Sequence, residues 1–396
     1  YDIRLSLVGS EMCIRDRWWN SYWKRSYVFI DSSKIGSDYW KVGRNYQLFR
    51  YMLGCNAYGS EPTKFNGGLF TFDPVHIDST RVFTPDFRLW GGGTMTAQNQ
   101  RLVYFPMLKS GDFDMMKPQF DFYERMLDNA KLRTKVYWNH EGACFSEQIE
   151  NFGLPNLAEY DWKPRHEGFP VGVDSNPWLE YTWDTALEFA LMMFDAHLYN
   201  NEPIVPHLPF IESLLTFFDE HYSYLALRRG TNKLDGDGHL VLYPGSACET
   251  YKMATNATST VAALKVITEK LLELPELDAT QREHWSGFLK RIPPISHREV
   301  QGKKTISPAK MWERINNSEV PSLYPVYPWR IYGIGQPELQ TAINTYLYDP
   351  EAIEFRSHIG WKQDNIFAAC LGLTEEAERL TLLKPVSYTH LTLPTN

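Results

Sequence analysis

The sequence contains 396 residues, of which 43% are hydrophobic and 22% are charged, so it is long enough to bury the core of one large domain or two medium ones. Its formal net charge of −8 argues against nucleic acid as a partner, because phosphate contacts need clustered Lys and Arg side chains. Aromatic residues make up 15% of the chain, more than core packing usually requires, and such rings stack on the faces of sugars.

Both ends of the chain differ from what lies between them. The leader "SLVGSEMCIRDR" (6–17) precedes an abrupt change to the aromatic-rich "WWNSYWKRSYVF", and the uncharged tail "PVSYTHLTLPTN" (385–396) has no helical period. Both segments closely resemble translated read-through of sequencing adapters. We therefore expect residues 1–17 and 385–396 to lie outside the natural protein, and residues 18–384 to form one domain of a longer bacterial chain. Ordinary disordered termini are the alternative.

Apolar residues at helical spacing predict about ten helices along the chain. The pattern over residues 116–130 predicts one helix, with Asp114 as its cap and Pro118 in its first turn. Further strong patterns cover 183–194, 211–218 and 261–272. Weaker patterns cover 39–53, 95–108, 281–289, 339–346 and 361–373.

Strand signals are few and short. "HLVLY" (239–243) predicts a strand ahead of Pro244, and "HREVQGKKTIS" (297–307) predicts a hairpin around Gly302. There is no alternation of strands and helices and no sequence repeat. Paired helices joined by long, motif-bearing loops predict an all-α fold, a toroid of helical hairpins with a few short strands. A helical solenoid is the alternative.

Neither a membrane span nor a metal site is expected. No uninterrupted apolar run approaches the roughly 20 residues that cross a bilayer. The Cys residues outside the leader are far apart and form no CxxC pair, and no HExxH spacing exists, so we expect no metal and no other cofactor. The sequence does not indicate an oligomeric state.

Glu249 is the first candidate for chemistry. In "LVLYPGSACETYKM" the chain passes Pro244 and Gly245 and then presents Glu249 among small and aromatic neighbours. A carboxyl group in apolar surroundings has a raised pKa, which suits a general acid that works near neutral pH. The alternative is that Glu249 caps a helix beginning near Ala254.

Two further segments carry candidate polar side chains. In "RLWGGGTMTAQNQRLVYFP" three consecutive Gly allow the backbone to approach a ligand, and Gln98 and Asn99 follow on the next turn. In "SHIGWKQDNIFAACLGL" Asp364 lies three residues after Trp361 on one helical face and is a candidate base. The alternatives are a solvent-facing turn for the first segment and, for Asp364, an interaction with the helix dipole. "WNHEGACFSE" adds Glu147 as a polar contact for a sugar.

The order of these motifs resembles glycoside hydrolase family 95, whose members are inverting six-hairpin glycosidases best known as α-L-fucosidases. "FNGGLFTFD" is similar to the family's Leu-Gln-Gly-x-Trp-Asn segment, and "LWGGGTMTAQNQRLVYFP" to its Asn-rich helix. "PGSACETY" is similar to its general-acid segment, "PSLYPVYP" to its Ser-His-Leu-Tyr run, and "GWKQDNIFAACLGL" to the helix that precedes its base. Ala97 and Ser322 depart from the family's Asn and His, which leaves the sugar open.

The resemblance implies a fold, a function and a site. The implied fold is an (α/α)6 toroid of helical hairpins, of which this chain would be a truncated part. The implied activity is hydrolysis of a plant or microbial oligosaccharide or polysaccharide with inversion, in a periplasmic or extracellular protein. Glu249 would be the acid, and Asn99 would position the water. The family's base lies in a later Asp-x-Asn-x-Gly-Gly segment that these residues do not contain, so we expect the chain by itself to lack its base and to be inactive. If the base is in the chain, Asp364 is the candidate. The residues expected to bind the carbohydrate substrate are Asn66, Trp90, Gln98, Glu147, Tyr251 and Trp361. The alternatives are a carbohydrate-binding toroid without catalysis and a toroidal epimerase or lyase.

Overall fold

The computed structural model describes residues 2–30, 34–56, 58–63, 95–155, 167–359 and 361–390, and most of them are helical. The helices are α1 (Asp2–Arg25), α2 (Asp38–Asn56), α3 (Ala97–Ser110), α4 (Lys117–Arg125), α5 (Leu127–Trp138), α7 (Thr185–Asn200), α8 (Leu208–Arg228), α9 (Thr258–Glu273), α10 (Ala279–Arg291), α11 (Leu339–Tyr348), α12 (Pro350–Glu354), α13 (Asp364–Cys370) and α14 (Thr374–His390). Short 3-10 turns are η3 (Phe113–Met115), η4 (Val205–His207) and η5 (Pro321–Leu323).

The strands in this part of the chain are short and form three small antiparallel sheets. They are β1 (Met95–Thr96), β2 (Gln148–Ile149), β3 (Gly245–Ala247), β4 (Tyr251–Ala254), β5 (His297–Val300), β6 (Lys303–Ile306) and β7 (Arg314–Ile315). β1 pairs with β2, β3 with β4 and β4 with β7, and β5 pairs with β6.

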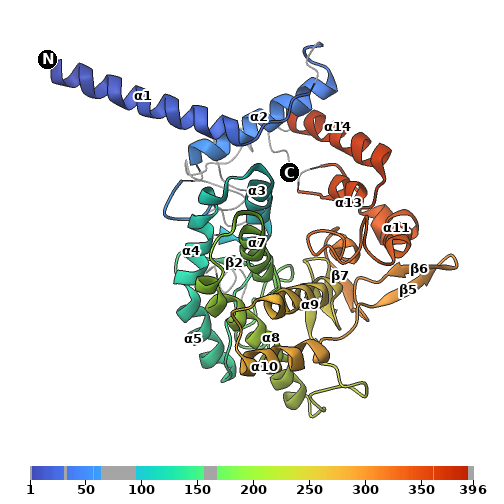
Figure 1. Cartoon of the computed structure of the whole chain (residues 1–396). Coiled ribbons are helices and arrows are strands. Elements are labelled where there is room, and N and C mark those ends of the chain that lie inside the picture. Colours follow the sequence, from blue (N-terminus) through green and yellow to red (C-terminus); the bar gives the residue numbers. More distant parts are fainter. Residues whose placement is uncertain are drawn as a thin grey trace.

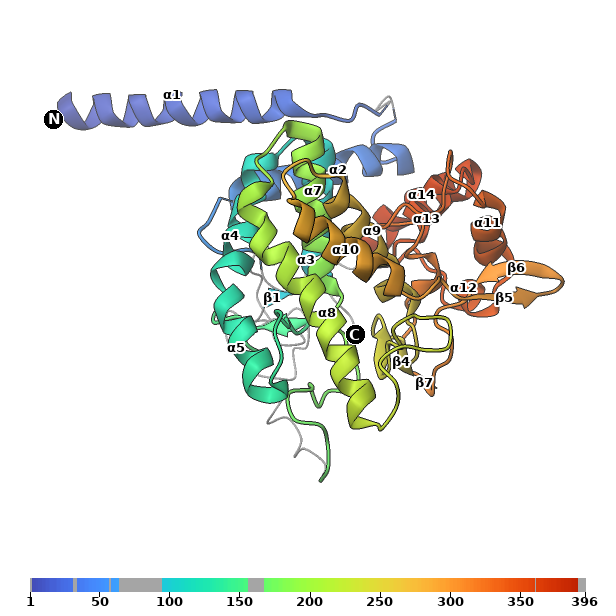
Figure 2. The same cartoon turned by 60° about the horizontal axis from the view of Figure 1, so that its bottom comes forward.

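The helices form a ring with an inner and an outer layer (Figures 1 and 2). α3 packs on α7, and α7 packs on α9, while α5, α8 and α10 lie outside them. α14 packs against α2, so the two ends of the ring meet, and Tyr39 of α2 donates a hydrogen bond to Glu378 of α14 at 2.6 Å. This arrangement is the predicted toroid of helical hairpins.

The inner position of α7 follows from its composition. This helix is apolar on all sides, and every residue from Ala186 to Ala196 is buried, including Glu188 and Asp195. A helix that is hydrophobic all round is stable only when it is surrounded by other elements. Because α7 occupies the interior, the polar side chains on its first turn are held inside the ring.

Most of the predicted helices are confirmed. The patterns over 183–194, 211–218 and 261–272 lie in α7, α8 and α9, and the five weaker patterns lie in α2, α3, α10, α11 and α13. The helix predicted over 116–130 is two helices, α4 and α5, separated at Met126. Pro118 is in the first turn of α4 as predicted, but Asp114 is not its cap. Asp114 instead pairs with Arg25 of α1 at 2.6 Å.

One of the two strand predictions is confirmed. β5 and β6 form the predicted hairpin, and Gln301 and Gly302 turn it with φ of 53° and 73°, the pair of positive angles that a type I′ turn needs. The strand predicted at 239–243 is wrong. Leu240 makes only an isolated bridge, its N–H donates to the carbonyl of Arg291, and the N–H of Leu242 donates to the side chain of Asn256.

The ribbon of the N-terminal helix α1 projects away from the ring at its start and lies against α2 in its second half (Figure 1). Residues 13–17 are exposed, whereas Tyr22 is fully buried, stacks on Trp18 at 5.2 Å and donates to the carbonyl of Arg50 at 2.6 Å. Packing of the described side chains of α1 therefore starts at Trp18. Among the described residues, no helix combines the length and the apolar character needed to cross a membrane.

Candidate functional site

The starts of three helices, α3, α7 and α9, line one small cavity, and the start of a fourth helix, α13, lies beside it. The cavity has a volume of about 10 Å³, enough for roughly one water molecule. It is lined by residues from the first turns of three of these helices, namely Gln98, Arg101, Thr185, Glu188 and Ser259, and by Thr182, Asp184, Cys248, Tyr324 and Trp329. Gln363, the residue before α13, contacts Arg101. Helix N-termini carry partial positive charge, which favours the carboxylates found here.

Glu249 lies beside this cavity at the tip of a tight hairpin turn. β3 ends at Ala247, β4 begins at Tyr251, and the three residues between them form the turn. Cys248, which lines the cavity, has a φ of 53° and so lets the chain reverse immediately before Glu249. The helix that follows begins at Thr258, so Glu249 does not cap it.

The Glu249 carboxyl group is largely removed from water and has few partners. Its Oε2 accepts a hydrogen bond from Asn317 Nδ2 at 2.8 Å. Burial and the nearby charge of Glu319 raise its pKa to about 7, although Lys252, Asn317 and Arg101 act in the opposite direction. The predicted environment for a general acid is therefore present at Glu249.

Glu319 joins Glu249 to the cavity. Its Oε2 accepts from the backbone N–H of Glu249 at 2.8 Å. Its Oε1 accepts from the side-chain amide of Gln98 and from the hydroxyl of Tyr324, the latter at 3.2 Å, and lies 3.6 Å from Arg101. Because Gln98 and Tyr324 line the cavity, these contacts connect the tip of the hairpin to α3 and to the segment after η5.

Two buried cations, Arg101 and Lys252, balance the charge of the carboxylates, and both already donate hydrogen bonds to oxygens of the protein. Arg101 donates to Glu188 at 3.0 Å and to Tyr324 at 2.7 Å, and the amide oxygen of Gln363, when turned toward it, accepts at 3.1 and 3.2 Å. Lys252 of β4 is completely buried, and the three N–H donors of its ammonium group are shared among four oxygens within hydrogen-bonding distance, those of Trp178, Glu180, Thr182 and Ser246. Burial lowers the pKa of Lys252 to about 8, although Glu249 and Glu319 favour its charged form.

Three further carboxyl groups of the site have raised pKa values because they are buried. Glu147 is fully buried, and its Oε1 accepts from the backbone N–H of Gln98 at 2.5 Å. Asp184 accepts from the hydroxyls of Ser259 and Thr260 at 3.0 and 2.8 Å. Glu188 pairs with Arg101. The structure thus brings the predicted residues Glu249, Gln98 and Glu147 together.

Asp364 and Trp361 lie at the start of α13, next to the site. Asp364 is buried, with 1% of its surface exposed, and its Oδ2 accepts from the N–H of Ser357 at 3.3 Å. Burial raises its pKa. The neighbouring Lys362 holds the segment before Glu319 by donating to Ser318 Oγ at 2.9 Å, and its ammonium lies 4.8 Å from the centre of the Trp361 ring. The role of Asp364 as a base stays a prediction.

The remaining predicted residues are dispersed. Asn99 is half-buried on the first turn of α3, beside Gln98. Tyr251 packs edge-on against Trp312 at 5.1 Å, and only 2% of it is exposed. It belongs to a small apolar cluster separate from the main core, whose other buried members are Ala247, Ala254, Ala257 and Ala309. Asn66 and Trp90 lie outside the described residues.

The sequence interpretation missed Glu319, Arg101, Glu188 and Asp184. Two of them carry a signal in hindsight, because Asp184 immediately precedes a largely apolar helix and Glu188 is on its first turn, where solvation is poor. Glu319 stands two residues before the "PSLYPVYP" run. Its contact with Glu249 depends on the pairing of β4 with β7, which no local pattern reveals.

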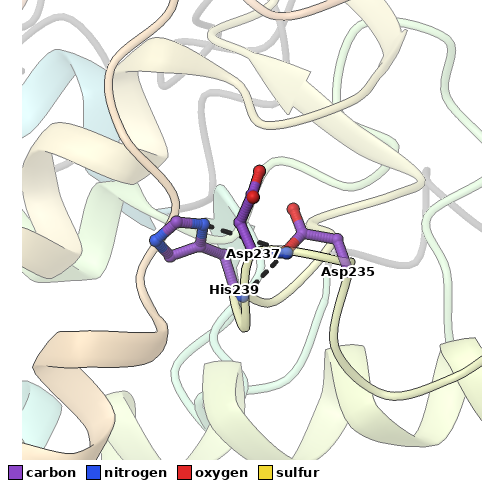
Figure 3. Close-up of side chains that lie close together, drawn as sticks. All are labelled: Asp235, Asp237 and His239. Carbon is purple, nitrogen blue, oxygen red and sulfur yellow. Dashed lines mark hydrogen bonds and ion pairs between the residues drawn. The ribbon is translucent and has the colours of Figure 1, made fainter.

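A second acidic group lies in a surface loop (Figure 3). Asp235, Asp237 and His239 place possible metal ligands within 4.8 Å of one another. However, Asp235 Oδ1 already accepts from the backbone N–H groups of Asp237 and His239, at 3.0 and 2.9 Å. This is the pattern by which an Asp side chain holds a turn.

No protein-family model and no curated protein matches the chain. A solved structure titled "Putative kojibiose phosphorylase from human microbiome" is similar to it with a TM-score of 0.59 at 14% sequence identity. The match covers 96% of this chain and 50% of that chain, so the chain spans about half the length of the structure it matches. The fold is a six-hairpin glycosidase-like toroid. The similarity supports this fold and does not single out family 95.

Proposed function

We propose that the chain carries the general acid of a glycosidase site: Glu249 protonates the leaving oxygen of a glycosidic bond. The observation that carries the proposal is the position of Glu249 at the tip of the β3–β4 turn, where burial and Glu319 raise its pKa to about 7. An acid with this pKa is protonated in a large fraction of molecules near neutral pH and can still release its proton.

The substrate class is proposed from the fold and from the polar groups around Glu249. The similar structure is titled as a phosphorylase that acts on a sugar. The amide of Asn317 donates to the acid and that of Gln98 donates to the neighbouring Glu319, and amides bind sugar hydroxyls without adding charge. A plant or microbial oligosaccharide or polysaccharide is therefore the proposed substrate, as in family 95, and an exported protein is the proposed setting.

Water is the proposed acceptor, in preference to phosphate. Arg101 and Lys252 already donate to oxygens of the protein, and Glu147, Glu188 and Glu319 surround them. A phosphate dianion that entered here would meet carboxylates and no spare cation among the described side chains of the site. In the proposed inverting reaction Asn99 positions the water and Asp364 is the candidate base, a mechanism that requires room for that water between the two carboxyl groups.

The test is hydrolysis of neutral aryl glycosides and plant oligosaccharides by the full-length protein and by its Glu249→Gln variant. We expect kcat to fall about 100- to 10,000-fold, the usual contribution of general acid–base catalysis. Glu273→Gln, an exposed position at the end of α9, is the control and should retain full activity. NMR of the released sugar should show the inverted anomer, and inorganic phosphate should not accelerate the reaction.

Two outcomes would overturn the proposal. Activity of Glu249→Gln within a few-fold of the native protein would remove Glu249 from the acid role. Binding of oligosaccharides by the full-length protein with no turnover of any of them would favour a carbohydrate-binding toroid without catalysis.

A further inference from the structure

Glu319 is attached to the Glu249 turn at two points. Its side-chain Oε2 accepts from the backbone N–H of Glu249 at 2.8 Å, and its own backbone N–H donates to Thr250 Oγ1 at 2.9 Å. The N–H of Asn316 also donates to the carbonyl of Thr250 at 2.8 Å. The segment that follows β7 therefore runs alongside the turn and is bonded to it by main-chain and side-chain groups.

The other oxygen of Glu319 is held from the opposite side. Oε1 accepts from Gln98 of α3 and from Tyr324, and it lies 3.6 Å from the guanidinium of Arg101. Only 2% of Glu319 is exposed. A carboxylate with donors on both oxygens has a fixed orientation, because any rotation would leave a buried donor without a partner.

We propose that Glu319 is the positioning residue of this site: it holds the Glu249 turn through the backbone N–H of Glu249 and places a like charge beside the Glu249 carboxyl group. The proposal rests on the proposed function only in that Glu249 is taken as the acid. No part of the sequence interpretation assigned a role to Glu319, and its contacts join β3–β4, β7 and α3 at one point.

The charged groups that face Glu249 come from four elements. Glu319, after β7, favours the protonated form of Glu249, whereas Lys252 of β4 and Arg101 of α3 favour the ionised form. Glu147, before β2, is the fourth group, and the charge of Glu249 raises the pKa of Glu147. Burial is the largest cause of the raised pKa of Glu249, and Glu319 is the next. Removing the charge of Glu319 should therefore lower this pKa without abolishing the effect of burial.

Two substitutions separate the two roles of Glu319. Glu319→Gln removes the charge but keeps an oxygen that can accept from the Glu249 N–H. The new amide nitrogen would donate to Gln98 and Tyr324, because a side-chain amide and a hydroxyl can each accept a hydrogen bond as well as donate one. Glu319→Asp keeps the charge but is one methylene shorter, so it should release the Glu249 N–H. Glu188→Gln is the matched control, because Glu188 is also buried and paired with Arg101 but is not among the groups that shift Glu249.

The experiment needs no substrate. In the whole chain, the carboxyl carbon of Glu249 is titrated by 13C NMR, with its signal assigned by its loss in Glu249→Gln. We expect Glu319→Gln to lower the pKa of Glu249 by about one unit, and Glu188→Gln to shift it by no more than about 0.3 units. In Glu319→Asp we expect hydrogen exchange of the Glu249 amide to become at least about tenfold faster, with the pKa still raised.

Three results would overturn the inference: a native titration in Glu319→Gln, an equal shift in Glu188→Gln, or unchanged amide exchange in Glu319→Asp. If Glu319→Gln does not fold, the exchange measurement on Glu319→Asp decides. Because none of these readouts depends on turnover, a protein that is inactive on every sugar tested would overturn the proposed function and leave this inference standing.

Discussion

The two acidic groups of the molecule are built in opposite ways. The group around Glu249 gathers carboxylates from four distant segments, and burial raises the pKa of Glu147, Glu188 and Glu249. The group in the surface loop lies within residues 235–239, and backbone N–H donors lower the pKa of Asp235. A carboxyl group therefore holds its proton more strongly in the group around Glu249 and releases it more readily in the surface loop. Only the first arrangement costs folding free energy at neutral pH, which is typical of a functional site.

The largest effect expected from this comparison is at Arg101. Arg101→Met leaves Glu188 and Glu319 buried without the cation that pairs with them, at 3.0 and 3.6 Å. We expect a loss of about 3–5 kcal/mol in the free energy of unfolding, measured in urea near neutral pH. Arg228→Met, on the exposed end of α8, is the control and should cost less than about 1 kcal/mol. A loss below about 1 kcal/mol at Arg101 would mean that the buried carboxylates are not paired as described.

The second prediction concerns the pH dependence of stability. A carboxyl group whose folded pKa is raised contributes stability that is fully present below its unfolded pKa and is lost as the pH rises through the folded pKa. For Glu249 this window runs from the ordinary value of 4.5 to about 7. Between pH 4.5 and 7.5 we expect the native protein to lose on the order of 2–3 kcal/mol relative to Glu249→Gln. If urea unfolding gives the same difference in free energy of unfolding between the native protein and Glu249→Gln at both pH values, Glu249 has an ordinary pKa.

The part of the fold that could be predicted is the part that depends on neighbours in sequence. Helices α7, α8 and α9 and the β5–β6 hairpin follow from apolar spacing and from a Gly in the turn. The strand prediction at 239–243 failed because the backbone donors of that segment bond to Arg291 and Asn256, which are remote in the chain. Local composition does not contain that information.

The same distinction applies to the site. Glu249, Gln98 and Glu147 could be chosen from their local surroundings, and the structure places them together. Glu319 could not, because its position depends on β7 pairing with β4 and on α3 supplying Gln98. Tyr251 shows the converse: it follows the acid by two residues, yet Glu249 lies in the turn, Tyr251 begins β4, and the Tyr251 ring packs on Trp312. Proximity in sequence therefore does not by itself indicate a shared site.

The smallest effect is expected in the surface loop. Asp235→Ala removes an acceptor of two backbone N–H bonds, at 3.0 and 2.9 Å, in a loop where water can replace it (Figure 3). We expect a loss of about 0.5–1.5 kcal/mol in urea unfolding near neutral pH. Because the folded pKa of Asp235 is lowered, its contribution is present above the unfolded value of 3.8 and is lost as the pH falls through the folded pKa, the reverse of Glu249. Asp237→Ala, at the exposed neighbour, should change stability by less than about 0.5 kcal/mol. An Asp235→Ala cost as large as that of Arg101→Met would show that the loop group is not held by its own backbone alone, and the contrast between the two groups would fail.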